Sequence, residues 1–277
     1  MRLNYRHAFH AGNFADLVKH AALLAVLDDM LASPGPVTII DTHAGRGLYD
    51  LASAEAQRSG EAKAGIGRLM QAQDLPQAML PLRSAVVELN RAHRGDFYPG
   101  SPLLIASRIR AQDHYLACEL RPEEYQALAL VLRKVTNATP LCVDGYGTVA
   151  EKIPGDGKVL VLIDPPFERA DDYGQIVVAL ARIVHKNPLA QVLIWLPLKD
   201  LETFDGFLRD AEDCGAGSLT IVEARMRPLV DPMKMNGCAL VLAGVPPMLE
   251  GRLRDIADWT VRSLGSQGQA RIWHAAP

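Results

Sequence analysis

The strongest constraint on the fold is the stretch from Lys158 to Glu168, which reads KVLVLIDPPFE. Its five consecutive aliphatic residues, 159–163, are typical of a strand buried on both faces, as in the middle of a parallel sheet. Because proline cannot continue a central strand, Pro165 and Pro166 turn the chain out at the carboxyl edge of the sheet. Open α/β sheets bind ligands at that edge. The stretch therefore predicts a carboxylate, a rigid loop and an aromatic ring beside a ligand-binding crevice.

Strands and helices are expected to alternate along most of the chain. Further strands are expected at residues 37–41, 114–119, 140–144, 191–197, 218–226 and 238–244. Helices are expected between most of them and near 249–263. Only a loop separates the last two strands, which favours an antiparallel pair. Seven strands with short connections and aliphatic runs indicate an α/β fold with a doubly wound, seven-stranded, Rossmann-like sheet.

Two segments lie outside this alternation. Residues 1–33 hold an N-terminal motif and an amphipathic helix, for which Asn13 is the expected cap. Residues from about 48 to 97 are polar and alanine-rich, with helical rather than strand character, and they predict a small inserted helical subdomain. Directly after this insertion, Ser101 is expected to cap a helix whose first residue is Pro102.

The composition is that of a protein with a full hydrophobic core. With 277 residues, 49% of them hydrophobic, the chain fits one large domain or a domain with an insertion. No apolar run approaches the ~20 residues needed to span a bilayer, and the N-terminus lacks the uninterrupted apolar core of a signal peptide. We therefore expect a cytoplasmic protein.

The four cysteines are widely spaced and form no C-x-x-C pair. They are Cys118, Cys142, Cys214 and Cys238. This pattern fits reduced thiols better than a disulfide framework or a zinc site. All but Cys214 fall in predicted strands, so we expect these three to be buried.

The net charge of −3 argues against a broad electrostatic field for nucleic acid. A nucleic-acid partner would need a local positive surface, and two groups of basic residues could supply one. These are Arg2, Arg6 and Lys19 near the N-terminus, and Arg225, Arg227 and Lys234 near the C-terminus.

Four predicted strands end in acids, namely Asp41, Glu119, Asp144 and Asp164. Since the carboxyl ends of parallel strands line one edge, these carboxylates should surround one crevice. The loop after the first strand, THAGRG at 42–47, lacks both the G-x-G-x-x-G and the G-K-[ST] phosphate patterns. The ligand expected is thus a nucleoside without a pyrophosphate. Glu119 suits the ribose hydroxyls, and Asp144 suits an adenine amino group that lies close to Gly145.

This order of acids resembles class I S-adenosylmethionine-dependent methyltransferases, and D-P-P-F is similar to their [DNS]-P-P-[YFW] motif for amino groups of adenine or cytosine. Such an amine is a poor nucleophile because its lone pair is delocalised into the ring. The Asp164 carboxylate and the Pro165 carbonyl can accept hydrogen bonds from its two N–H groups. Asp164 can also take the proton that the amine loses as the methyl transfers. Phe167 can stack on the base, a contact worth ~1–3 kcal/mol. The sulfonium carries the reactive methyl, so no metal is required.

Several motifs together resemble the RlmJ family, whose members are 23S ribosomal RNA adenine-N6 methyltransferases. They lie at 5–20 (YRHAFHAGNFADLVKH), 41–45, 98–102, 144–145 and 163–167. The resemblance implies cofactor contacts at His20, His43, Ser101, Glu119, Asp144, Gly145 and Asp164. It also implies that Asp164 is the catalytic proton acceptor, that Tyr5 contacts substrate, and that His7 and Lys19 belong to the same substrate-binding motif. The family usually has D-P-P-Y, so Phe167 keeps the stacking face and loses a hydroxyl.

The predicted function is therefore S-adenosylmethionine-dependent N6-methylation of one adenine in 23S ribosomal RNA, protein-free or in an early precursor, by a monomer. One alternative is a DNA adenine-N6 methyltransferase, although no DNA-reading module is evident. A second is a non-catalytic RNA-binding module, which would not need both Glu119 and an intact DPPF motif. A dinucleotide oxidoreductase is disfavoured by the 42–47 loop. From the residues alone, a core histidine on an apolar helix is the preferred interpretation of His20. No carboxylate or thiol lies at ligand spacing from His7 and His10, so no metal site is expected there.

Overall fold

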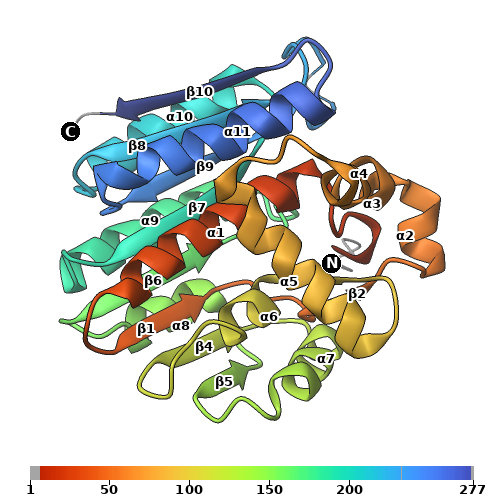
Figure 1. Cartoon of the computed structure of the whole chain (residues 1–277). Helices are drawn as coiled ribbons and strands as arrows, with labels where there is room; N and C mark the ends of the chain where they lie inside the picture. The colour runs from red at the N-terminus through yellow and green to blue at the C-terminus, as the bar shows by residue number, and fades with distance from the viewer. Residues whose placement is uncertain (1–6, 232, 276–277) are drawn as a thin grey trace.

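A computed structural model of the chain describes residues 7–231 and 233–275, and its centre is a sheet of eight strands (Figure 1). Five strands are parallel: β1 (Val37–Asp41), β4 (His114–Cys118), β5 (Ala138–Leu141), β6 (Lys158–Ile163) and β7 (Gln191–Leu198). Three more extend the sheet in antiparallel fashion: β8 (Leu219–Arg225), β9 (Gly237–Ala243) and β10 (Gln269–Ala275). The strand order is β10-β8-β9-β7-β6-β1-β4-β5. The predicted α/β class and the antiparallel pairing of β8 with β9 are confirmed.

The position of β6 explains its unbroken aliphatic run. It lies between β1 and β7, with Leu160 beside Ile39 on one side and Gln191 on the other. Residues 159–163 are fully buried because helices cover both faces of the sheet. The chain leaves β1 toward β4 and β5 on one side, and later continues through β6 and β7 on the other. A topological switch point therefore lies at the carboxyl ends of β1 and β6.

Two helical layers enclose the sheet. One face carries α1 (Phe14–Ala32), α5 (Leu80–His93), α6 (Ser101–Ala106), α7 (Pro122–Leu132) and α11 (Glu250–Leu264). The other carries α8 (Gly145–Lys152), α9 (Asp172–Lys186) and α10 (Leu201–Asp213). Figure 1 shows α1 and α11 side by side on the same face.

Helix α1 is buried almost all round rather than amphipathic, because it packs against the sheet on one side and against α5, α6 and α11 on the others. A helix that is largely apolar on all sides suits such a position, and its buried charged residues, Asp16 and Lys19, lie near its N-terminus. Its N-terminus is capped as predicted, since the Asn13 side chain accepts hydrogen bonds from the backbone N–H groups of Ala15 and Asp16.

The polar segment after β1 is closed by a two-stranded antiparallel ribbon of β2 (Leu48–Asp50) and β3 (Phe97–Pro99). Between these strands lie α2 (Ala54–Ser59), α3 (Glu61–Ala64), α4 (Ile66–Gln71), the 3-10 turn η2 (Gln77–Met79) and α5. The boundaries predicted for the helical subdomain, about 48 and 97, fall on the two strands. Two further 3-10 turns are η1 (His7–Phe9) and η3 (Pro247–Leu249).

The structure corrects four further sequence-based predictions. β10 is an eighth strand that the sequence did not reveal, since its run QARIWHA is partly exposed at the sheet edge. Gly100, not Ser101, occupies the cap position of α6. The strand predicted at 140–144 ends at Leu141, so Cys142 lies outside it and is exposed. Helix α8 begins at Gly145, where two glycines conceal its helical character.

No helix within 7–231 and 233–275 has both the length and the apolar character needed to cross a bilayer.

Close packing between α8 and the loop after β1 requires glycine at residue 145. A Cβ added there would lie 2.0 Å from the carbonyl oxygen of Thr42. We expect Gly145→Ala to lower the free energy of unfolding by at least about 2 kcal/mol, because the obstacle is rigid backbone. The matched control is Gly174→Ala in α9, where nothing lies within 4 Å of the added Cβ and stability should hold or rise by up to ~1 kcal/mol. Urea unfolding measures both, and equal losses would contradict the packing argument.

Candidate active site

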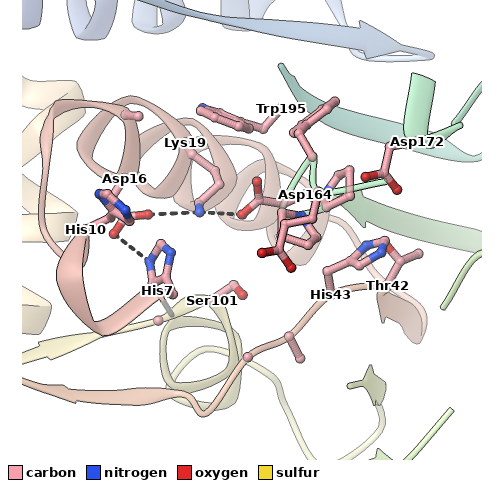
Figure 2. Close-up of a pocket in the computed structure, with 18 of the residues that line it drawn as sticks. His7, His10, Asp16, Lys19, Thr42, His43, Ser101, Asp164, Asp172 and Trp195 are labelled. Carbon is pink, nitrogen blue, oxygen red and sulfur yellow. Dashed lines mark hydrogen bonds and ion pairs between the residues drawn. The ribbon is translucent and has the colours of Figure 1, made fainter. Parts of the chain in front are cut away.

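A cavity of about 490 Å³ opens at the carboxyl edge of the parallel strands (Figure 2). Its walls come from the ends of β1, β4, β6 and β7, from the start of α8, and from α1 together with η1. All the predicted site residues that the structure describes line it: His7, Lys19, His20, His43, Ser101, Glu119, Asp144, Gly145, Asp164 and Phe167. Tyr5, and Arg6 beside it, lie outside the described residues. The sheet topology thus brings together side chains far apart in the sequence.

Glu119 follows β4 and is held in place by backbone donors. One carboxylate oxygen accepts from the N–H of Gly45 at 3.0 Å, and the other from the N–H of Arg121 at 2.7 Å. Burial raises the pKa of the Glu119 carboxyl, and these two N–H groups oppose the rise. Each oxygen keeps a further lone pair, so the carboxylate can still accept hydrogen bonds from a ligand in the cavity.

Asp144 and His43 form the next part of the same wall. The Asp144 side chain caps α8 by accepting from the N–H of Tyr146. The His43 ring lies edge-on to the Tyr146 ring, with centroids 4.7 Å apart, and its Nδ1 is 2.8 Å from Thr42 Oγ1. Burial, with a smaller effect of the Arg169 charge, lowers the pKa of His43 to about 3. The imidazole is therefore neutral at physiological pH.

His20 and Ser101 are buried and bonded to protein groups. His20 Nδ1 is 2.7 Å from the Tyr98 hydroxyl, and burial together with the Lys19 charge lowers the pKa of His20 well below its usual value. The Ser101 hydroxyl donates a hydrogen bond to the Asp41 carboxylate at 2.6 Å. This bond, and not the predicted capping of α6, is the role of the serine side chain in the structure. Both line the cavity. Their predicted contact with a cofactor stays a prediction.

Asp164 is the first residue after β6, and its carboxylate has a partner from α1. Lys19 Nζ donates to Asp164 Oδ2 at 2.5 Å and lies 2.9 Å from Asp16 Oδ1 (Figure 2). The Lys19 side chain is only 6% exposed, whereas that of Asp164 is 18% exposed. Burial opposes the positive charge, but Asp16 and Asp164 raise the pKa of Lys19 well above its usual value. The predicted substrate contact of Lys19 is untested, and its ammonium faces two carboxylates.

Phe167 adopts a left-handed backbone conformation, with φ of +51°. This conformation is costly for an aromatic residue and is found where the surrounding structure enforces it. The ring packs against Tyr173 and Trp195, with centroid distances of 5.0 and 5.8 Å. The aromatic face predicted from the DPPF motif is therefore one member of a small aromatic cluster beside Asp164.

Sequence reasoning missed several residues that line the cavity. Trp195 and Pro197 come from β7, Lys199 follows this strand, and Met235 comes from the β8–β9 connection. The i, i+3 spacing of Asp16 and Lys19 was visible in the sequence, but not the burial of Asp16. For Trp195, the only signal was an aromatic residue inside an otherwise aliphatic strand.

The inserted segment also reaches the cavity. His10 Nδ1 lies 3.0 Å from the Glu61 carboxylate, which also accepts from the Asn13 side chain. The hydrogen bond to Glu61 raises the pKa of His10. His7 likewise contacts Asp16, so each of the two histidines does have a carboxylate neighbour, contributed by the fold. Among the described residues, no cluster of His, Cys, Asp and Glu could hold a metal ion.

Comparisons with known proteins show which family the chain resembles. Residues 34–275 match the family described as "Ribosomal RNA large subunit methyltransferase D, RlmJ". Two relatives, each called ribosomal RNA large subunit methyltransferase J, come from Haemophilus influenzae and Escherichia coli. The first is 32% identical and the match covers 96% of this chain and 95% of that protein. The second is 31% identical, with 93% and 92% covered. A crystal structure of a Legionella pneumophila protein superimposes with a TM-score of 0.85 at 27% identity, covering 96% of this chain and 98% of that one.

A doubly wound sheet whose acids converge on a cavity beside a D-P-P-F loop defines a Rossmann-like methyltransferase. The chain belongs to the RlmJ family of ribosomal RNA large-subunit methyltransferases. The predicted family, the enzyme class and S-adenosylmethionine as cofactor are thereby confirmed. Methylation of ribosomal RNA is the general function that follows.

The Asp41 carboxyl was predicted to border the crevice, but it is fully buried and is not part of the cavity lining. It instead gives the stability of the fold a pH dependence. Burial, reinforced by the Asp164 charge and opposed by Ser101, raises the pKa of Asp41 from 3.8 to about 6. The folded protein therefore holds this proton more tightly than the unfolded chain, and that stabilisation is lost as pH rises from 3.8 to about 6. Relative to Asp41→Asn, the wild type should lose up to ~3 kcal/mol of unfolding free energy between pH 4 and 7, at 1.36 kcal/mol per pH unit. Urea unfolding at both pH values tests this, and a pH-independent difference would refute it.

Proposed function

We propose that the protein transfers a methyl group from S-adenosylmethionine to N6 of one adenine in 23S ribosomal RNA. The observation that carries the proposal is the Asp164 carboxylate, held at the end of a buried strand and followed by the proline pair and Phe167. We further propose that the substrate is protein-free RNA or an early precursor and that the enzyme acts as a monomer. The family membership supports the ribosomal RNA, and the amino-group motif supports N6 of adenine.

The side of the cavity formed by β1, β4 and α8 fits the cofactor. Glu119 keeps acceptor capacity for two ribose hydroxyls, since each of its oxygens accepts only one backbone N–H in the structure. Asp144 can accept from the adenine amino group at the start of α8, and the neutral His43 adds no charge that would repel a sulfonium. The cofactor supplies a methyl group on a positively charged sulfur. The glycine at 145 serves packing against Thr42, which is a stronger reason for it than close approach of a ligand.

The opposite side, formed by β6, β7 and the β8–β9 connection, fits the target base. Lys19 engages Asp164 Oδ2, and no group among the described residues bonds Oδ1. Oδ1 can therefore accept an N–H of the adenine amino group, with the Pro165 carbonyl accepting the other. These two acceptors would favour a pyramidal nitrogen whose lone pair points away from them. As the N–C bond forms, Asp164 can take the proton that the nitrogen loses.

The decisive experiment incubates the protein with methyl-labelled cofactor and unmodified 23S ribosomal RNA, 16S ribosomal RNA or DNA. We expect label as N6-methyladenosine in 23S RNA alone. Label in DNA would establish the DNA alternative, and cofactor-free RNA binding with no methylation of any substrate would establish the non-catalytic one.

Asp164 variants separate its two proposed roles within the same assay. Asp164→Ala should abolish methyl transfer while calorimetry still detects cofactor binding. Asp164→Asn keeps an acceptor oxygen but cannot take the proton. Its rate should therefore lie between those of the wild type and the Ala variant, roughly 10²–10⁴-fold below the wild type. A fully active Asn variant would contradict proton acceptance by Asp164, and a fully active Ala variant would contradict the whole mechanism.

Replacement of Phe167 tests stacking on the target base. Phe167→Leu should reduce kcat/KM for RNA by roughly 5- to 150-fold, which corresponds to the ~1–3 kcal/mol of one base–aromatic contact. Phe167→Tyr keeps the ring face and is the matched control, since neither Leu nor Tyr is β-branched and both meet the same left-handed backbone. If Leu and Tyr variants turn over RNA equally well, the ring does not stack on substrate.

A further inference from the structure

A buried carboxylate of α1, Asp16, lies next to the methyl-transfer site and has no role in the mechanism above. Its side chain is 2% exposed. One oxygen accepts from the Gly12 backbone N–H at 2.9 Å and is 3.0 Å from His7 Nε2, and the other is 2.9 Å from Lys19 Nζ. Lys19 in turn reaches Asp164. Asp16 is thus the centre of a chain of contacts between the N-terminal segment and the D-P-P-F carboxylate.

We propose that Asp16 is a positioning residue for methyl transfer: it holds the Lys19 ammonium between two carboxylates and fixes His7 at the mouth of the cavity. The inference rests on the proposed function, because it concerns the same reaction. Asp16 acts through Lys19 and His7 and does not touch the reacting atoms.

The charge balance of the cluster explains why two carboxylates are needed. Asp16, Lys19 and Asp164 together carry one net negative charge. If Asp16 were neutral, the ammonium would be balanced by Asp164 alone, and Asp164 would be a weaker acceptor for the amine proton. Because Asp16 takes up part of the Lys19 charge, the remaining negative charge stays at the edge of the cavity, where the nitrogen becomes positive during transfer.

The contacts between these two groups and their neighbours keep both ionised, against the opposing effect of burial. Burial by itself would raise the pKa of Asp16, but its neighbours His7 and Lys19 hold it well below its usual value. Burial would lower the pKa of Lys19, but Asp16 and Asp164 raise it well above its usual value, so the ammonium stays protonated. An ion pair with this little solvent exposure is screened weakly by salt. The contacts of the cluster should therefore depend little on ionic strength.

The position of Asp16 also couples the cluster to the start of α1. It lies in the first turn of the helix, one turn before Lys19, and its bond to the Gly12 N–H fixes the chain where it enters the helix. Through His7, which is 22% exposed and contacts the Tyr49 ring at 4.9 Å, the same carboxylate anchors the segment before the helix. One side chain thus orients both the lysine and the N-terminal wall of the site.

The test compares Asp16→Asn, Lys19→Met and the double variant, with assays of methylation, cofactor binding and thermal unfolding. We expect Asp16→Asn to lower kcat at least tenfold while cofactor Kd changes less than about threefold. Lys19→Met leaves two buried carboxylates without a counter-charge and should have the lowest Tm. The double variant restores the net charge of −1 and should melt above Lys19→Met, with a kcat no lower than that of the worse single variant.

The control is Asp113→Asn. Asp113 is fully buried and pairs with Arg110 at the same i, i+3 spacing, but it precedes β4 at the opposite edge of the sheet. This variant should lose stability and keep kcat when assayed below its Tm.

Three results would overturn the inference: an unchanged kcat in Asp16→Asn, additive losses of kcat in the double variant, or a loss of kcat in Asp113→Asn equal to that in Asp16→Asn. Failure of the proposed function gives a different result, because the wild type itself would then methylate no adenine in 23S RNA. In that case the positioning role of Asp16 is overturned with it, while the rescue of Tm still reports on the charge cluster.

Discussion

A buried ammonium group requires nearby negative charge, and the contact between Lys19 and Asp164 therefore governs how the site is built. Helix α1 supplies the lysine and one carboxylate, and β6 supplies the other, 145 positions later in the chain. Such a cluster carries a large desolvation cost, and apolar residues of similar size often stabilise a protein more. Its retention at the mouth of a ligand cavity is consistent with a functional role, since charges this deeply buried are otherwise rare.

The sheet divides the cavity into two chemically different halves. The carboxyl ends of β1 and β4 and the start of α8 present acids and backbone groups that suit a nucleoside. The ends of β6 and β7 present Phe167 and Trp195, and Tyr173 of α9 packs against the Phe167 ring. Asp164 lies at the boundary, because β6 is the neighbour of both β1 and β7. This placement puts one carboxylate between the two halves of the cavity.

Segments far from the catalytic motif support this arrangement. The antiparallel strands β8, β9 and β10 extend the sheet beyond β7, and the β8–β9 connection returns to the cavity at Met235. Helix α1 is held against the sheet by α5 of the inserted segment and by α11 of the C-terminal segment. The cost of the buried charges in α1 is thus offset by an apolar surface that is buried on nearly every side.

The sequence by itself determined the α/β class, the central position of β6 and many of the residues that line the cavity. Those features depend on local patterns: aliphatic runs, prolines that end a strand, and acids at strand ends, which a parallel sheet necessarily brings to one edge. It did not reveal β10 or α8, because an alternating strand at the sheet edge and a helix that begins with two glycines carry weak local signals. Tertiary structure alone decided that Ser101 bonds Asp41, that Trp195 forms a wall of the cavity, and that Asp16 shares Lys19 with Asp164. The physical reason is that the partner of a buried polar group is set by long-range packing, on which local residue patterns carry no information.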